Sequence, residues 1–264
     1  MEDWVIESTS PLEVMHATTP VLTGNRFVRN VHRGVMLIAC ERALVRGNHF
    51  DGCAPNRPML ILLTSRNCRI LENRFFGANR CIGLTIGGRS HTNRAVANSF
   101  FNCLFGIEFS GGKNPRNMLL GNLMFNPRYS GIRMRKCGER TLMRNCVVWG
   151  ARRAGLEIEE AAGLAVENCV FAKCAQSAIL PDAEAAIEFR HNCFWQNGPD
   201  KAERPRGLRD GSTNVQTDPM FVDPEAGNFR LMTKAFGHPQ DSPLLRAGAP
   251  GGTSIGLYPW GIRR

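Results

Sequence analysis

The stretch Asn98-Ser99-Phe100, followed by Gly106-Ile107-Glu108-Phe109, is the unit from which the chain is built. It recurs as Asn122-Leu123-Met124 with Gly131-Ile132-Arg133-Met134. The leading asparagine returns at intervals of 23, 25, 25, 24, 23, 23 and 24 residues, as Asn25, Asn48, Asn73, Asn98, Asn122, Asn145, Asn168 and Asn192. A period of this length is typical of a solenoid, in which each repeat forms one coil of a stack.

Two apolar positions accompany each asparagine. The residue three before it is apolar in all eight repeats: Leu22, Val45, Ile70, Ala95, Leu119, Leu142, Ala165 and Phe189. The residue two after it is apolar as well: Phe27, Phe50, Phe75, Phe100, Met124, Val147, Val170 and Phe194. We therefore expect both columns to face the core. The asparagine amides between them would stack as an Asn ladder that satisfies the backbone of a buried corner.

Strands and turns account for the rest of each repeat. Short segments such as Gly155-Leu156-Glu157-Ile158 alternate as strands do, and Gly, Asn, Ser and Pro lie between them. The repeats contain no ten-residue helical stripe. A leucine-rich repeat, the alternative fold at this period, would need a helical half-repeat and the spacing Leu-x-Leu-x-x-Asn, and the sequence has neither.

This pattern resembles the right-handed parallel β-helix proteins of the pectate-lyase-like superfamily, in its bacterial right-handed β-helix repeat branch. The resemblance covers roughly residues 20 to 260 and includes a closing tail with Asp218-Pro219-Met220-Phe221-Val222-Asp223-Pro224. It implies an all-β chain: a single-stranded right-handed parallel β-helix of about eight to ten coils. We expect one domain over residues 1–264, divided into a first incomplete coil (1–20), regular coils (21–198) and a charged loop with the closing segment (199–264).

Bulk properties restrict the partners. A net charge of +10 and a pI near 9.5 favour anionic partners, of which the resemblance makes an acidic polysaccharide the expected one. Nucleic acid is not expected, because the aromatic residues are assigned to the core. No apolar run is long enough to span a membrane.

The two ends of the chain differ. The opening residues Met1-Glu2-Asp3-Trp4-Val5-Ile6 have no signal-peptide pattern, although the resemblance implies an extracellular or periplasmic protein. They also lack the amphipathic helix that covers the first coil in the resembled family. We therefore expect a partner or a missing segment to cover the N-terminal coil.

The 10 cysteines include no Cys-x-x-Cys pair and no Cys/His cluster with ligand spacing. Several occupy repeat positions, such as Cys146, Cys169 and Cys193 directly after an asparagine. We expect most to be small buried residues with reduced thiols. Neighbouring coils could also bring two of them within bridging distance.

The strands of the Gly-Ile-x-Ile type hold the candidate site. If their apolar residues point inward, two outward columns result. One reads Met36, Ile61, Thr85, Glu108, Arg133, Glu157, Leu180, and the other reads Ile38, Leu63, Gly87, Ser110, Arg135, Glu159, Asp182. Both columns change from apolar to charged along the chain.

This charged cluster has two interpretations. It is either a ladder of surface ion pairs or a site for a polyuronate. In the second case Arg133, Arg135, Glu108 and Glu157 are the candidate catalytic residues, with an arginine as base or as clamp on the substrate carboxylate. Glu157, Glu159 and Asp182 could then hold calcium.

A basic ridge adjoins the cluster. It comprises Arg89, Lys113 and Lys136, each in the turn after one of these strands. With Glu159 and Asp182, these are the candidate substrate-binding residues, although solvated turn residues would look the same.

Two functions follow from these alternatives. The first is a carbohydrate-active protein that binds an acidic polysaccharide and cleaves it by lyase-type β-elimination. The second is a non-catalytic glycan-binding or structural β-helix module of a larger surface protein. The catalytic motifs of pectate lyases, polygalacturonases and alginate epimerases are absent, which leaves enzymatic activity open.

Overall fold

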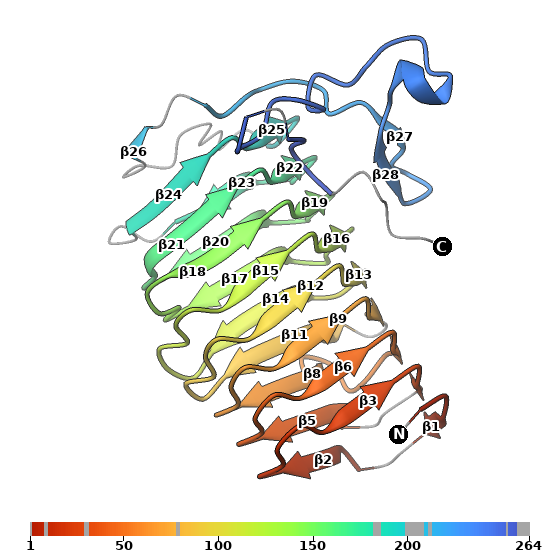
Figure 1. Cartoon of the computed structure of the whole chain (residues 1–264), viewed down its shortest axis with the longest axis vertical. Coiled ribbons are helices and arrows are strands. Elements are labelled where there is room, and N and C mark those ends of the chain that lie inside the picture. The colour runs from red at the N-terminus through yellow and green to blue at the C-terminus, as the bar shows by residue number, and fades with distance from the viewer. Residues whose placement is uncertain are drawn as a thin grey trace.

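The chain forms a rod of stacked coils. The computed structural model describes residues 2–7, 10–28, 32–77, 80–181, 186–198, 209–210, 213–251 and 253–257. Three parallel sheets run along the rod, with the first coil at one end and strands β24 to β26 at the other (Figure 1). The predicted all-β right-handed parallel β-helix is confirmed. The predicted count of eight to ten coils is slightly high, because the turns number about 7.

Each coil contributes one strand to each sheet. Sheet A contains β3 (Val21–Thr23), β6 (Leu44–Arg46), β9 (Arg69–Leu71), β12 (Arg94–Val96), β15 (Met118–Leu120), β18 (Thr141–Arg144), β21 (Ala162–Glu167), β24 (Ala186–Arg190) and β26 (Arg209–Asp210). Sheet B contains β1 (Val5–Glu7), β4 (Arg26–Val28), β7 (His49–Asp51), β10 (Arg74–Phe76), β13 (Ser99–Phe101), β16 (Leu123–Phe125), β19 (Val147–Trp149), β22 (Val170–Ala172) and β25 (Cys193–Trp195).

Sheet C contains the longer strands and carries the candidate site. Its members are β2 (Leu12–Met15), β5 (Val35–Ile38), β8 (Pro58–Leu63), β11 (Ile82–Gly87), β14 (Phe105–Ser110), β17 (Ser130–Arg135), β20 (Ala154–Glu159) and β23 (Ser177–Leu180). Beyond the coils lie the antiparallel pair β27 (Phe221–Asp223) and β28 (Asn228–Leu231) and the 3-10 helix η2 (Lys234–Phe236). No helix among the described residues has the length and apolar character needed to cross a membrane.

Aromatic rings and amides form two internal columns, as expected. The rings of Phe27, Phe50, Phe75 and Phe100 stack at 4.6–4.8 Å between centroids. Beside them each ladder amide serves the coil before it. The Oδ1 of Asn73 accepts both the backbone N–H and the side-chain amide of Asn48, at 2.9 and 3.0 Å, and its Nδ2 donates to the Val45 carbonyl. The buried corner is thereby satisfied without water.

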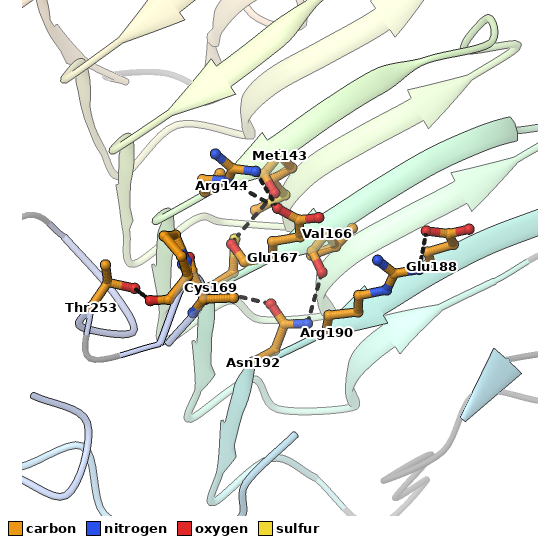
Figure 2. A network of polar contacts seen from close by, with 12 residues as sticks. Met143, Arg144, Val166, Glu167, Cys169, Glu188, Arg190, Asn192 and Thr253 are labelled. Atoms are coloured by element: carbon orange, nitrogen blue, oxygen red, sulfur yellow. Dashed lines mark hydrogen bonds and ion pairs between the residues drawn. The ribbon is translucent and has the colours of Figure 1, made fainter. Parts of the chain in front are cut away.

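The Asn ladder differs from the prediction in two coils. Asn145 and Asn168 do not occupy it, and Cys146 and Cys169 stand in their place. Nδ2 of Asn122 points to Sγ of Cys146, and the Cys169 N–H donates to Oδ1 of Asn192 at 2.9 Å. Figure 2 shows that same Asn192 donating to the Val166 carbonyl. The ladder resumes there and continues to Asn214, whose Oδ1 accepts the Asn192 amide.

The one-residue shift has a backbone cause. In the other coils the residue before the ladder position adopts the left-handed conformation, as Gly121 does with φ 60°. In these two coils Asn145 and Asn168 take that corner themselves, with φ 53° and 54°. Other coils place Glu72, Ala97 or His191 at the same corner, and asparagine adopts this conformation more readily than those residues.

The shift also changes which side chains face the core. The prediction of an inward direction was wrong for Leu142, Ala165, Val147 and Val170, because a one-residue slip moves every side chain to the other face. Their neighbours Met143, Val166, Val148 and Phe171 belong to the central core instead and align with its columns.

The displaced asparagines bind the C-terminal segment. The Nδ2 of Asn145 donates to the carbonyls of Ser254 and Gly256. Asn168 exchanges two hydrogen bonds with the backbone of Ala249 and accepts the Gly256 N–H. The C-terminal segment covers the outward apolar face of sheet B here and forms a second buried cluster with it. Sheet B contributes Leu123, Val147, Trp149 and Val170, and the C-terminal segment contributes Phe221, Phe229, Leu244 and Ile255.

All ten cysteines are buried free thiols, as expected for most of them. Burial raises the pKa of the Cys68 thiol to about 11 and that of Cys174 to about 12. These thiols therefore stay protonated and act as small core residues.

Candidate functional site

The outward face of sheet C has the register that the sequence predicts. Thr85 pairs with Glu108, Glu108 with Arg133, and Arg133 with Glu157, on strands β11, β14, β17 and β20. In the preceding coils the same outward column is apolar. Met36 pairs there with Ile61, and Ile61 pairs with Thr85. Hydroxyl, carboxylate and guanidinium groups thus succeed one another at the spacing of adjacent strands, about 4.8 Å.

Arg133 is the centre of this column. Its guanidinium nitrogens lie 3.8 Å from Glu108, 3.8 Å from Glu157 and 3.3 Å from Glu159. The side chains of Arg133, Glu108 and Glu157 are only 16%, 12% and 6% exposed. Solvent screening of these charges is therefore weak, and the carboxylates hold Arg133 in its charged form.

Arg135 and Glu159 form the outer part of the cluster. They lie on adjacent strands, 3.0 Å apart, and both side chains are 45% exposed. An exposed pair of this kind contributes about 0–1 kcal/mol to stability. It can therefore open to a ligand at small cost, whereas the Arg133 network is held in place.

An aromatic wall borders the cluster where the chain enters sheet C. The Arg133 guanidinium lies 5.0 Å from the centre of the Phe105 ring, and Arg153 lies 4.8 Å from that of Tyr129. The two rings meet edge to face at 5.5 Å, and Arg153 also donates to the Tyr129 hydroxyl. Such cation–π contacts orient both guanidinium groups.

The same wall fixes Glu157. One carboxylate oxygen accepts a hydrogen bond from the Ser130 hydroxyl at 2.8 Å, and the other lies 3.5 Å from Arg153. Sequence reasoning missed Phe105, Tyr129, Ser130 and Arg153. The available signal was their position, since each lies at or just before the start of a sheet C strand.

The surroundings of Glu108 change the pKa of its carboxyl. Burial raises the pKa of its carboxyl above the ordinary value, although the nearby Arg135 opposes the shift. A carboxyl with a raised pKa can exchange a proton at a milder pH than an exposed one. Glu108 therefore has the chemistry required of a general acid or base.

The predicted basic ridge lies in the turns that follow β11, β14 and β17. The side chains of Arg89, Lys113 and Lys136 are exposed. Lys136 lies 3.6 Å from Glu160, and within the described chain neither Arg89 nor Lys113 has an ion pair. The ridge and the cluster are thus neighbours on successive strands and turns.

The remaining expectations concern a metal. Asp182, an expected calcium and substrate ligand, lies outside the described residues. Within the described ranges no group of three or more His, Cys, Asp or Glu side chains is placed to hold a metal ion. The carboxylates of Glu157 and Glu159 form ion pairs with arginines instead.

Comparison with known proteins agrees with this architecture. A family described as "Right handed beta helix region" matches residues 4–124 and 60–216. A search of the curated proteins gave no match.

Solved structures share the fold at low identity. A mutant of the periplasmic alginate epimerase AlgG superposes with a TM-score of 0.55 and 16% identity, over 69% of this chain and 47% of that one. A double mutant of the tailspike protein of E. coli bacteriophage HK620, in complex with a pentasaccharide, gives 0.59 and 14%, over 81% and 47%. This chain therefore spans about half the length of these two proteins.

Proposed function

This chain belongs to the right-handed β-helix family, and we propose that the outward face of its sheet C binds an acidic polysaccharide. The observation that carries the proposal is the column Thr85, Glu108, Arg133 and Glu157, held in register and bordered by aromatic rings. Hydroxyl, carboxylate and guanidinium groups are the hydrogen-bonding partners that sugar hydroxyls and carboxylates require.

Two further observations support this proposal. The net charge of +10 favours association with a polyanion. The names of two structural neighbours refer to saccharides: an alginate epimerase and a tailspike protein in complex with a pentasaccharide. A linear polymer is also the ligand that best fits a flat face made of successive strands.

Affinity electrophoresis in gels containing alginate, polygalacturonate or chondroitin tests binding, with neutral dextran as the control polymer. We expect retardation by at least one acidic polymer and none by dextran. Arg135→Gln should weaken the retardation, because it removes the half-exposed guanidinium of the outer pair. Equal migration in every gel would rule out the proposed function.

Lyase-type β-elimination is the second candidate, and the raised pKa of Glu108 is the observation that favours it. A base would remove the proton on the carbon next to the uronate carboxylate. The C–O bond to the leaving sugar would break, a C=C bond would form, and the leaving oxygen would take up a proton. Glu108 fits the base, and Arg135 fits the cation that neutralises the carboxylate.

Arg133 fits a positioning role better than that of the base. Three carboxylates around it stabilise its protonated form, and a base must lose its proton. Its ion pairs with Glu108 and Glu157 would hold the two carboxylates apart on the strand face.

Ultraviolet absorbance of unsaturated uronate products separates elimination from binding alone. A lyase should release these products from the polymer that binds, and Glu108→Gln should abolish release while the polymer is still retarded. Arg133→Ala should also abolish turnover. Binding without any unsaturated product would identify the chain as a glycan-binding module.

A further inference from the structure

Two turns beside the candidate site are longer than their neighbours. One residue separates the sheet C strand from the next inward corner residue in four other coils: Ala39, Thr64, Lys136 and Glu160. After β11 this connection has two residues, Gly88 and Arg89, and after β14 it has residues 111–113. The enlarged turns therefore occur where the outward face of sheet C changes from apolar to polar.

The two enlarged turns lie directly against each other. A methyl group added to Gly111 would lie 3.4 Å from the backbone nitrogen of Gly88, and one added to Gly112 would lie 3.4 Å from Cγ of Arg89. Gly88, Arg89, Gly111 and Gly112 all have positive φ, between 61° and 120°. Glycine permits this conformation and leaves the backbone open on the outer side.

Donor groups gather at this point. Within the described chain, no protein acceptor takes the backbone N–H groups of Arg89, Gly112 or Lys113. The cations of Arg89 and Lys113 are exposed, and the structure gives neither an ion pair within the described ranges. Successive turn N–H groups that converge beside cations form a recurrent binding site for anions.

We propose that these twin glycine turns, with Arg89 and Lys113, bind the oxyanion groups of the polymer, its carboxylates or sulfates. This proposal rests on the proposed function and assigns the anionic groups to the turns. The arginines of the cluster are already matched by Glu108, Glu157 and Glu159. The Arg133 network would then contact neutral hydroxyls of the same polymer, while the half-exposed Arg135 stays available to a carboxylate of the polymer.

A double substitution with a matched control tests the assignment. Arg89→Gln with Lys113→Gln removes both free cations of the turns. Arg69→Gln with Arg94→Gln removes two exposed cations that are paired in register on adjacent coils of sheet A. All four side chains are exposed, so both double variants should fold. The probes are polygalacturonate and its carboxyl-reduced, neutral form, with dextran sulfate as the sulfated probe.

We expect the turn variant to bind the acidic probes at least about tenfold more weakly, which is about 1.4 kcal/mol of binding free energy, because two charged hydrogen-bond donors are lost. The sheet A variant should bind within about twofold of the unmodified chain, as a rim charge in water contributes little. Equal losses in both variants, or no loss in the turn variant, would overturn the assignment. The relative losses for polygalacturonate and dextran sulfate distinguish carboxylate from sulfate.

Amide chemical shifts in a titration with inorganic sulfate keep the two proposals separable. Shifts confined to Gly88, Arg89, Gly112 and Lys113 support the anion site even if no polymer binds, in which case only the proposed function fails. Shifts spread over the whole chain would refute the anion site. Gly111→Ala, which places a methyl group against the Gly88 nitrogen, should abolish the confined shifts.

Discussion

A ladder asparagine serves two coils at once. Its Oδ1 accepts a backbone N–H and a side-chain amide from the coil before it, and its Nδ2 reaches a carbonyl further back. Serine performs a similar task at another corner, where the Ser65 hydroxyl accepts the Cys40 N–H and donates to the Leu37 carbonyl. Each position matches a buried donor with a buried acceptor, so the corner needs no water.

Asn73→Ala should therefore destabilise the whole rod. It leaves the buried backbone N–H of Asn48 without its acceptor, at about 1–3 kcal/mol, and removes the side-chain hydrogen bond to the Val45 carbonyl. Urea denaturation followed by circular dichroism would measure the lost free energy of unfolding. Gln176→Ala, at an exposed position, is the control. Equal stability of the two variants would contradict the role assigned to the ladder.

Glu108 should make stability depend on pH with a defined sign. Its pKa in the folded chain is raised above the ordinary value of about 4.5, so its contribution is fully present below that pH. The contribution is lost as pH rises through the folded-state pKa. The difference in free energy of unfolding between the unmodified chain and Glu108→Gln should thus decrease from pH 4 to pH 8.

Glu13→Gln is the control for this titration, because it removes an exposed carboxylate from the same face of sheet C. The pH dependence assigned to Glu108 is the difference between the Glu108→Gln offset and the offset of this control. A Glu108→Gln offset that grows with pH would show that the folded-state pKa is lowered.

At the scale of single strands, the repeat predicted the sheets but not the one-residue shift of the Asn ladder at Cys146 and Cys169. Asn145 and Asn168 keep the regular spacing, so the sequence suggests an unbroken ladder. The usable signal was Phe171, which follows its asparagine by three residues, whereas Phe100 follows by two. The slip depends on which residue takes the left-handed corner. Hydrogen bonds to Ala249, Ser254 and Gly256, which are distant in sequence, favour the shifted choice.

Asn168→Ala should consequently loosen the C-terminal segment and leave the coils intact. Hydrogen–deuterium exchange of the Ala249 amide would report the loosening, because this N–H donates to the Oδ1 that the substitution removes. Exchange in β7 and β10 should not change. Accelerated exchange throughout the rod would place Asn168 in the ladder after all.

The outward face of sheet C was predictable because its strands keep strict alternation. The column from Met36 to Leu180 follows from period two once the inward residues are known. The aromatic wall was not predictable in the same way. Phe105 and Tyr129 lie where a turn enters a strand, and the direction of a side chain there depends on the path of the turn.

At the scale of the whole molecule, the C-terminal segment joins coils that would otherwise touch only their neighbours. Phe229 lies edge to face with Phe125 at 5.7 Å and with Trp149 at 5.6 Å. Lys173 reinforces the attachment, with its ammonium 2.9 Å from Glu225 and 4.7 Å from the centre of the Trp149 ring. The pair β27–β28 lies alongside the rod (Figure 1).

Phe229→Ala should open this contact and expose Trp149 to water. Removing a buried phenylalanine costs about 3–5 kcal/mol, most of which should fall on the C-terminal segment. Tryptophan emission should shift to longer wavelength while far-ultraviolet circular dichroism stays unchanged. Phe236→Ala, at an exposed ring, is the matched control. An unchanged emission spectrum would show that the segment does not depend on Phe229.

A crystal structure of the chain with a bound acidic oligosaccharide would show which face of the rod holds the polymer. We expect the saccharide along the outward face of sheet C, with its hydroxyls near Glu108 and Arg133 and its oxyanions at the turns of Arg89 and Lys113. An oligosaccharide bound to sheet A or sheet B, with the outward face of sheet C bare, would contradict the account.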